Sequence, residues 1–317
     1  MLLTAPPPAL TPFRQGRFAD LPAEPRLPHA FDRTEGLELL LPEGPFAGMR
    51  VHVRRYGEGP PLLLVHGLMT SSYSWRYVFE ALGERFTCYA PDLPGNGRSE
   101  RPLEVAYSPE NLARWLACVQ RALGIRGCPI LANSMGGYLS LHLALADPAA
   151  MSRLIDLHSP GVIDHRMRAL GAAFAVPGAE ALARYLIRRR PLEWAHRNVH
   201  YFDESLKSLE EAREYGELLG SFSGAQCLVK YLKEALALGP MRELRRELEA
   251  RRGGAGFPVP LLLLYAEQDP MVPPRFGRVF ADLIPDARFA ALQDASHFAH
   301  VDAVERFLPP VLEFLSE

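Results

Sequence analysis

The strongest chemical signal in the sequence is a serine placed between an apolar run and two glycines. The segment is Ile130-Leu-Ala-Asn-Ser134-Met-Gly-Gly137. The apolar run predicts a buried strand, and the glycines open an apolar helical pattern, so Ser134 lies at a sharp strand-to-helix turn. Such a turn exposes the hydroxyl above the sheet, and small residues two positions to either side, Ala132 and Gly136, let strand and helix approach closely. Ser134 is the candidate nucleophile.

Two further residues have the types needed to activate that hydroxyl, which is a weak nucleophile alone. His297 follows the last predicted strand, where a loop could bring its imidazole over Ser134. Asp269 follows the preceding strand and would orient the imidazole and offset its charge. The carboxyl ends of parallel strands meet at the edge where open α/β sheets place their sites. The pattern predicts a Ser134, Asp269, His297 triad, with His300 as the alternative base.

Acyl transfer also needs donors for the oxyanion that forms on the attacked carbonyl. The backbone N–H of Met135 begins the helix after Ser134, and helix N-termini favour negative charge. A second N–H should come from the loop after His66-Gly67. Leu68 is the expected donor, and Met69 is the alternative.

Strand-like and helical patterns alternate along most of the chain. Several apolar runs are continuous, which predicts a sheet covered on both faces and therefore parallel strands with helical crossovers. The alternation stops between about 160 and 252, where only helical patterns occur, and Gly253-Gly-Ala-Gly256 marks the return to the sheet. The expected strands are 37–41, 49–54, 61–65, 86–90, 130–133, 153–157, 258–266 and 287–292, and the later helices are 166–174, 180–189, 205–219, 227–238 and 241–252.

These patterns predict three parts. Residues 1–35 are rich in proline and form an extended arm, residues 36–160 and 253–317 form an α/β core, and residues 161–252 form a helical cap inserted after the sixth strand. Apolar residues of the cap could wall a substrate pocket. We expect substrate contacts from Met69 and Phe298 near the triad and from Phe174 and Tyr185 in the cap.

Four blocks together carry a family resemblance that spans residues 37–317. They are Val65-His66-Gly67, Asp92-Leu-Pro-Gly95-Asn-Gly97-Arg-Ser99, the Ser134 turn, and the Asp269 and His297 pair. The chain resembles the α/β-hydrolase family. This resemblance implies an eight-stranded, mostly parallel sheet with helices on both faces and a helical lid, and a hydrolase that works through Ser134.

The resemblance leaves the reaction open. Thr70-Ser-Ser-Tyr-Ser-Trp75-Arg resembles capped haloalkane dehalogenases and epoxide hydrolases, but those enzymes use an aspartate where this chain has Ser134. Asn-Ser-Met-Gly-Gly resembles both esterases and the C–C hydrolases of aromatic ring degradation. C–C hydrolases usually carry a glycine- and proline-rich loop where this chain has Leu68-Met69-Thr70, so a carboxylic-ester hydrolase is favoured. A member of the fold that only binds a ligand is the third alternative.

Cofactors and metals have no assigned role in this hypothesis. Gly95-Asn-Gly97 lacks the third glycine of a dinucleotide loop, because that position is Glu100. His196 and His200, spaced i, i+4 with Asp203 nearby, could form a metal face, but surface histidines are the commoner interpretation. We therefore expect no metal and no cofactor.

Composition narrows the class of protein further. The chain has 317 residues, a net charge of −2 and a hydrophobic fraction of 48%, which is ordinary for a globular protein and argues against nucleic-acid binding. No apolar run reaches the roughly 18 residues of a membrane span. The four cysteines form no C-x-x-C pair, so buried reduced thiols and a cytoplasmic location are expected. The expected partner is a small, largely apolar ester, and a homodimer is left open.

Overall fold

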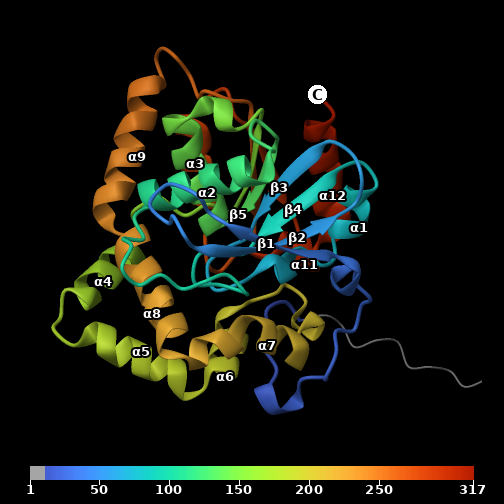
Figure 1. The fold of residues 1–317 in the computed structure, drawn as a ribbon, viewed down its shortest axis with the longest axis vertical. Helices are drawn as coiled ribbons and strands as arrows, with labels where there is room; N and C mark the ends of the chain where they lie inside the picture. Colours follow the sequence, from blue (N-terminus) through green and yellow to red (C-terminus); the bar gives the residue numbers. More distant parts are fainter. Residues whose placement is uncertain (1–10) are drawn as a thin grey trace, which may run out of the picture.

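The computed structural model describes residues 11–317. Eight strands form one sheet in the order β1-β2-β4-β3-β5-β6-β7-β8, and β2 alone runs against the others (Figure 1). The strands are β1 Glu35–Leu40, β2 Arg50–Tyr56, β3 Pro61–Val65, β4 Thr87–Pro91, β5 Ile130–Asn133, β6 Leu154–Leu157, β7 Leu261–Ala266 and β8 Arg288–Leu292. Each expected strand is present, within three residues of its predicted ends. The eight-stranded, mostly parallel sheet is thus confirmed.

Helices cover both faces of this sheet. One face packs against α2, α3, α9 and α10, and the other packs against α1 and α12. The helices are α1 Phe79–Gly83, α2 Pro109–Leu123, α3 Met135–Ala146, α4 His165–Phe174, α5 Ala179–Arg189, α6 Pro191–Asn198, α7 Leu209–Gly216, α8 Phe222–Lys230, α9 Leu238–Arg251, α10 Pro274–Leu283, α11 Ala299–Asp302 and α12 Val304–Leu315.

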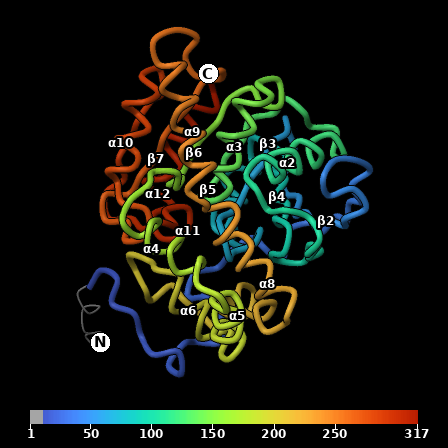
Figure 2. Tube along the Cα trace, turned by 90° about the vertical axis from the view of Figure 1, so that its left-hand side faces the viewer, coloured from blue at the N-terminus to red at the C-terminus, as the bar shows by residue number. Residues whose placement is uncertain are grey.

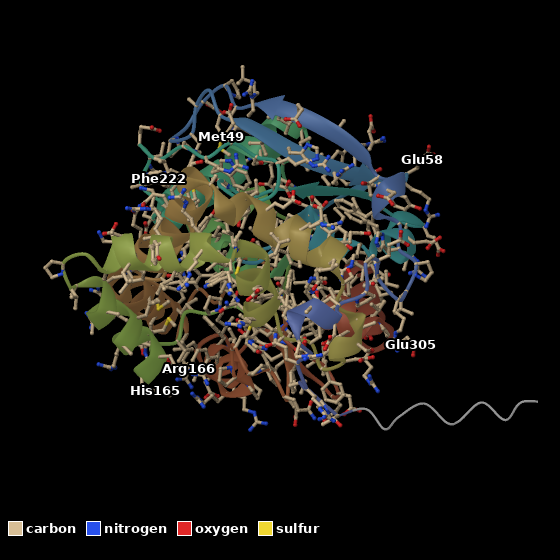
Figure 3. All side chains as sticks on the ribbon, turned by 90° about the horizontal axis from the view of Figure 1, so that it is seen from below. Met49, Glu58, His165, Arg166, Phe222 and Glu305 are labelled. Carbon is tan, nitrogen blue, oxygen red and sulfur yellow. The ribbon has the colours of Figure 1, made fainter. Side chains whose placement is uncertain are left out.

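The helices between β6 and β7 in sequence, called the cap here, sit at one end of the sheet (Figures 1 and 2). Figure 3 views the molecule from this cap side. The helices α4 to α8 build the cap, and α6 was not anticipated from the sequence. The final helix of the inserted stretch, α9, runs beside the core instead, because Met241, Leu244 and Leu248 join the same apolar cluster as α2 and α3.

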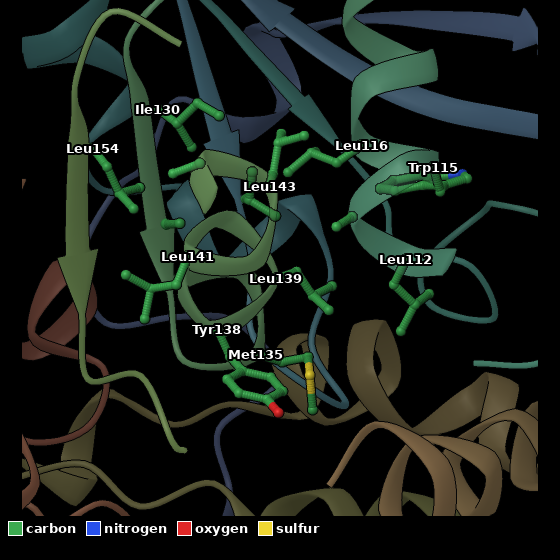
Figure 4. Close-up of a cluster of buried hydrophobic side chains, with 14 of the residues drawn as sticks. Leu112, Trp115, Leu116, Ile130, Met135, Tyr138, Leu139, Leu141, Leu143 and Leu154 are labelled. Carbon is green, nitrogen blue, oxygen red and sulfur yellow. The ribbon is translucent and has the colours of Figure 1, made fainter. Parts of the chain in front are cut away.

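Alternating side chains of the strands build two apolar clusters. In β3, Leu63 and Val65 enter one cluster while Leu62 and Leu64 enter the other, as the period of a strand requires. Figure 4 shows the first cluster, where α2 and α3 pack against β5 and β6. These two clusters hold the carboxyl ends of the central strands in fixed positions.

The described part of the proline-rich arm lies against the cap and the core. The amide of Gln15 donates to the His196 carbonyl at 2.7 Å, and the backbone N–H of Leu209 donates to the Pro22 carbonyl at 2.8 Å. The backbone N–H of Ala30 then donates to the Arg76 carbonyl in the core at 3.2 Å. The arm therefore bridges the two parts along their common edge.

Within residues 11–317, no single helix has both the length and the apolar composition needed to cross a membrane. The bent pair α4 and α5, with 105° between its helices, meets that criterion only when both are taken together.

Candidate active site

Ser134 occupies a strained turn between β5 and α3. Its backbone has φ 54° and ψ −116°, a conformation that is energetically unfavourable for any residue other than glycine. Its N–H donates to the Leu157 carbonyl at 2.7 Å. The turn is closed by its neighbours. A Cβ on Gly136 would lie 2.3 Å from the Val65 carbonyl oxygen, so only glycine fits there.

Backbone strain is concentrated around this turn. Five described residues other than glycine have positive φ, and four of them follow strands of the central sheet: Met69, Ser134, His158 and Asp294. Residues held in such conformations cluster at functional sites because the surrounding fold has to hold them there. The strain thus points to the same sheet edge that the sequence predicts.

His297 and Asp269 form a buried hydrogen-bonded pair. The Nδ1 atom of His297 lies 2.7 Å from Oδ2 of Asp269, and the two side chains are 3% and 0% exposed. A carboxylate can only accept here, so Nδ1 carries the proton and Nε2 is left as the basic nitrogen. His297 is therefore held in the tautomer that a general base needs.

Asp269 is arranged to stay ionised. Its other oxygen, Oδ1, accepts the backbone N–H groups of Met271 at 2.7 Å and Val272 at 3.0 Å. Burial opposes ionisation, but the charge and hydrogen bond of His297, aided by the backbone donor of Val272, outweigh it and lower the pKa of Asp269.

Asn133 connects the His297 loop to the Ser134 turn. Its amide nitrogen donates to the His297 carbonyl at 3.0 Å. Among the hydrogen bonds of residues 11–317, none joins the Ser134 hydroxyl to the His297 ring. Catalytic hydrogen bonds of this kind are often long without substrate and tighten when it binds.

The two expected oxyanion donors lie on either side of the turn. Met135 is the first residue of α3, where an N–H has no partner within the helix. The loop carrying Leu68 passes against the turn, because a Cβ on Gly67 would lie 3.1 Å from the Ser134 Cβ and 2.8 Å from the Asn133 side-chain oxygen. Met69, the alternative donor, has φ 66° and bends this loop.

Three of the four expected wall residues share one apolar cluster. Met69 and Phe298 belong to it, and Phe174 of α4 packs against it while remaining partly exposed. The Phe298 ring also contacts the His297 ring, with centroids 5.3 Å apart. Tyr185 differs, because it is 61% exposed on α5 and does not belong to this wall.

His158 is a buried neighbour of the pair that the sequence analysis missed. Its Nε2 atom lies 4.0 Å from Asp269 Oδ2 and accepts the Ala266 N–H at 2.6 Å. Burial, together with the nearby His297, lowers the pKa of His158 to about 3, so the ring is neutral. His158 directly follows β6, just as the other site residues follow strands of the sheet. This position after a strand is the sequence signal that could have identified it.

The histidines considered as an alternative base or as metal ligands lie in other environments. His300 is buried against Trp75, with ring centroids 4.5 Å apart, whereas His297 is the histidine paired with Asp269. The Nε2 atom of His196 donates to the Gly16 carbonyl at 3.0 Å. Because α6 ends at Asn198, His200 is not on the same helical face as His196.

One group of three potential metal ligands occurs in residues 11–317, and it consists of His158, Asp269 and His297. The lone pair of His158 Nε2 is already directed at the Ala266 N–H, and His297 Nδ1 is directed at Asp269. These hydrogen bonds fit a histidine that is oriented for proton transfer better than they fit a group of metal ligands.

Similarity to known proteins identifies the family of this chain. A family model described as the alpha/beta hydrolase fold matches residues 60–304. The chain belongs to the α/β-hydrolase family, and several of the relatives it matches are named as hydrolases or esterases.

Two of these relatives catalyse different reactions. The chain is 25% identical over 276 residues to 2-hydroxymuconate semialdehyde hydrolase of Pseudomonas sp. (strain CF600), covering 86% of this chain and 92% of that protein. It is 26% identical over 278 residues to pimeloyl-[acyl-carrier protein] methyl ester esterase of Aeromonas hydrophila, covering 84% and 100%. Among solved structures, a meta-cleavage product hydrolase from Pseudomonas fluorescens IP01 has 22% identity and a TM-score of 0.65, covering 89% and 97%.

Proposed function

We propose that this protein is a serine hydrolase that cleaves carboxylic esters through an acyl-enzyme. The observation that carries the proposal is the strained turn at Ser134, connected through Asn133 to a buried His297 and Asp269 pair. A serine placed at such a turn beside an oriented histidine is the arrangement that acyl transfer requires.

In the first half-reaction the Ser134 Oγ forms a bond to the carbonyl carbon and gives its proton to His297 Nε2. The N–H groups of Met135 and Leu68 hold the oxyanion of the tetrahedral intermediate. The intermediate then expels the alcohol, which takes the proton from His297, and the acyl group stays on Ser134. Asp269 remains ionised throughout and stabilises the imidazolium.

In the second half-reaction water replaces the alcohol. His297 takes one proton from the water as its oxygen bonds to the acyl carbon. The second tetrahedral intermediate collapses, the proton returns to Ser134 Oγ, and a carboxylic acid leaves. The apolar neighbours Met69, Phe298 and Phe174 favour an ester with an apolar acyl or alcohol group.

Carbon–carbon bond hydrolysis is the second candidate, and the 2-hydroxymuconate semialdehyde hydrolase relative favours it. Such a reaction needs polar or cationic groups for the substrate's carboxylate and enol. Arg166 is a candidate for such a group, since its guanidinium donates to the Pro270 carbonyl, one residue after Asp269, at 2.8 Å. Arg166 is an exposed residue of α4, whereas the residues packed beside His297 are apolar. These apolar neighbours favour the ester.

A comparison of two substrate classes tests this choice. We expect kcat/KM for a p-nitrophenyl ester of short or medium acyl length to exceed that for a ring-fission dienoate. Both substrates are assayed with wild-type protein and with Ser134→Ala as the blank. Efficient dienoate cleavage with negligible ester turnover would show that the triad serves a different pocket.

A further inference from the structure

The cap carries an unusual concentration of exposed apolar side chains. Eight large apolar residues within 11–317 are strongly exposed, and five of them belong to the cap. These five, called here the cap patch, are Val176 (59% exposed), Leu182 (59%), Tyr185 (61%), Leu186 (52%) and Phe222 (51%).

Most of the cap patch lies on one face of α5. Leu182, Tyr185 and Leu186 have the i, i+3, i+4 spacing of a single helical stripe, which here faces solvent. Ile187 lies on the opposite side and is buried in the cap. The helix is thus apolar on both faces, and folding uses only one of them.

Phe222, the first residue of the neighbouring helix α8, is the patch residue that lies beside α5 from another helix. The Arg184 guanidinium lies over the Phe222 ring, 4.6 Å from its centroid. Figure 3 shows Phe222 at the rim of the cap, with His165 and Arg166 of α4 also at the periphery. An apolar surface of several side chains in this position is a feature of interaction sites.

The surroundings of the patch are strongly basic. Residues 165–197 contain seven arginines, two glutamates and no lysine or aspartate, a net charge of +5 in a chain whose total is −2. Of the two acids, Glu193 is paired with Arg190 at 3.2 Å, and Glu180 is paired with Lys233, three residues after the end of α8. Arg188 and Arg189 end α5 directly after the apolar stripe, and both are exposed.

We propose that the cap patch docks onto an anionic lipid surface, with α5 lying in the plane of the interface. An apolar helical face bordered by arginines inserts its side chains at the headgroup boundary, while the guanidinium groups bind lipid phosphates. Tyr185 has the amphipathic ring that suits this depth.

A second copy of the chain fits the same surface less well. A twofold contact through α5 would bring the basic cluster of one copy against that of the other, and like charges across an interface oppose association. A lipid surface supplies the opposite charge to every arginine and apolar volume to every patch residue.

Vesicle co-sedimentation of the purified full chain tests the proposal. The vesicles are phosphatidylcholine alone and phosphatidylcholine with about 30% phosphatidylglycerol. We expect binding to the anionic vesicles, weaker binding without phosphatidylglycerol, and a decrease when NaCl rises to about 0.5 M. Ser134→Ala should bind like the wild type, because docking does not depend on hydrolysis.

A pair of matched double variants identifies the surface. Leu182→Asp/Leu186→Asp should lower the partition coefficient about tenfold or more, since it removes two inserting side chains and adds two like charges. Leu27→Asp/Leu40→Asp changes two leucines that are 43% and 65% exposed elsewhere and should bind like the wild type. Circular dichroism and ester turnover in solution should be unchanged in both variants.

Three results would overturn the proposal. One is wild-type protein that does not prefer anionic vesicles. Another is binding that Leu182→Asp/Leu186→Asp leaves intact. The third is a wild-type dimer, seen by light scattering without vesicle binding, that this variant dissociates.

Discussion

Asp269 determines which nitrogen of His297 can act as a base. Replacing Asp269 with asparagine keeps the size of the side chain but lets its amide donate to Nδ1, so His297 adopts the opposite tautomer. We expect kcat to fall by about three to four orders of magnitude with little change in fold. Steady-state ester hydrolysis measures the effect, and Asp294→Asn, at an exposed residue before the same histidine, is the control. Equal activities of the two variants would exclude Asp269 from the triad.

Most of the candidate site could be predicted because each residue follows an apolar strand. Ser134, Asp269 and His297 all stand directly or shortly after such runs, so residue type and chain order suggested a triad, and the family resemblance favoured His297 over His300. Asn133 was not recognised, because its role depends on a hydrogen bond to a residue 164 positions away. The exposure of Tyr185 could not be predicted either, since an apolar stripe on a helix does not reveal whether anything covers it.

A buried ion pair anchors the cap helix α7 to the core. Arg76 follows the 3-10 turn Ser72–Trp75, and its guanidinium lies 2.6 Å from Glu211, with side chains 0% and 4% exposed. Arg76→Met leaves the Glu211 carboxylate buried without its partner, so we expect a loss of about 3–5 kcal/mol in the free energy of unfolding. Urea unfolding measures this loss.

A double variant and a surface pair complete that test. Arg76→Met/Glu211→Gln should cost less than the two single changes added together, because no unpaired charge remains. Arg50→Met breaks an exposed pair with Glu100 and should cost about 1 kcal/mol or less. A loss at Arg76 no larger than that at Arg50 would contradict the anchoring role.

The central strand β6 carries a carboxyl group that makes stability depend on pH. Burial raises the pKa of Asp156 to about 7, against a smaller opposing effect of the Ser159 hydroxyl. The folded chain therefore keeps a proton that the unfolded chain releases near pH 4. This contribution to stability is complete below about pH 4 and is lost as the pH rises through about 7.

Asp156→Asn removes that titration. When the pH is raised from about 5 to about 8, the free energy of unfolding of the variant should increase by a few kcal/mol relative to that of the wild type. Urea unfolding at both pH values measures the change, with Asp282→Asn on the exposed side of α10 as the control. Parallel pH profiles for wild type and Asp156→Asn would show that Asp156 is ionised in the folded protein.

The strands were predictable because their apolar runs are bounded by turn residues. The positions of the cap helices and of the arm were harder to predict. The sequence placed α9 in the cap because its pattern continues the helical stretch, whereas Met241, Leu244 and Leu248 pack on the core. The arm has no periodicity, and contacts such as that of Gln15 with the His196 carbonyl join positions 181 residues apart.

The arm contacts both the cap and the core, and the cap packs beside the base. The arm contacts α6, α7 and the core turn before α1, while Phe298 beside the base packs against Tyr201 of the cap, with ring centroids 5.5 Å apart. The apolar stripe on α5 lies on the outside of this same cap.

Labelling with a fluorophosphonate probe, followed by mass spectrometry of the peptides, tests the assignment of Ser134 most directly. The probe reacts with a serine only where a base activates the hydroxyl and donors hold the phosphoryl oxygen. We expect one adduct, on Ser134, with no labelling in Ser134→Ala and greatly reduced labelling in Asp269→Asn. An adduct on another serine, or folded wild-type protein that does not react, would contradict a serine hydrolase built on Ser134.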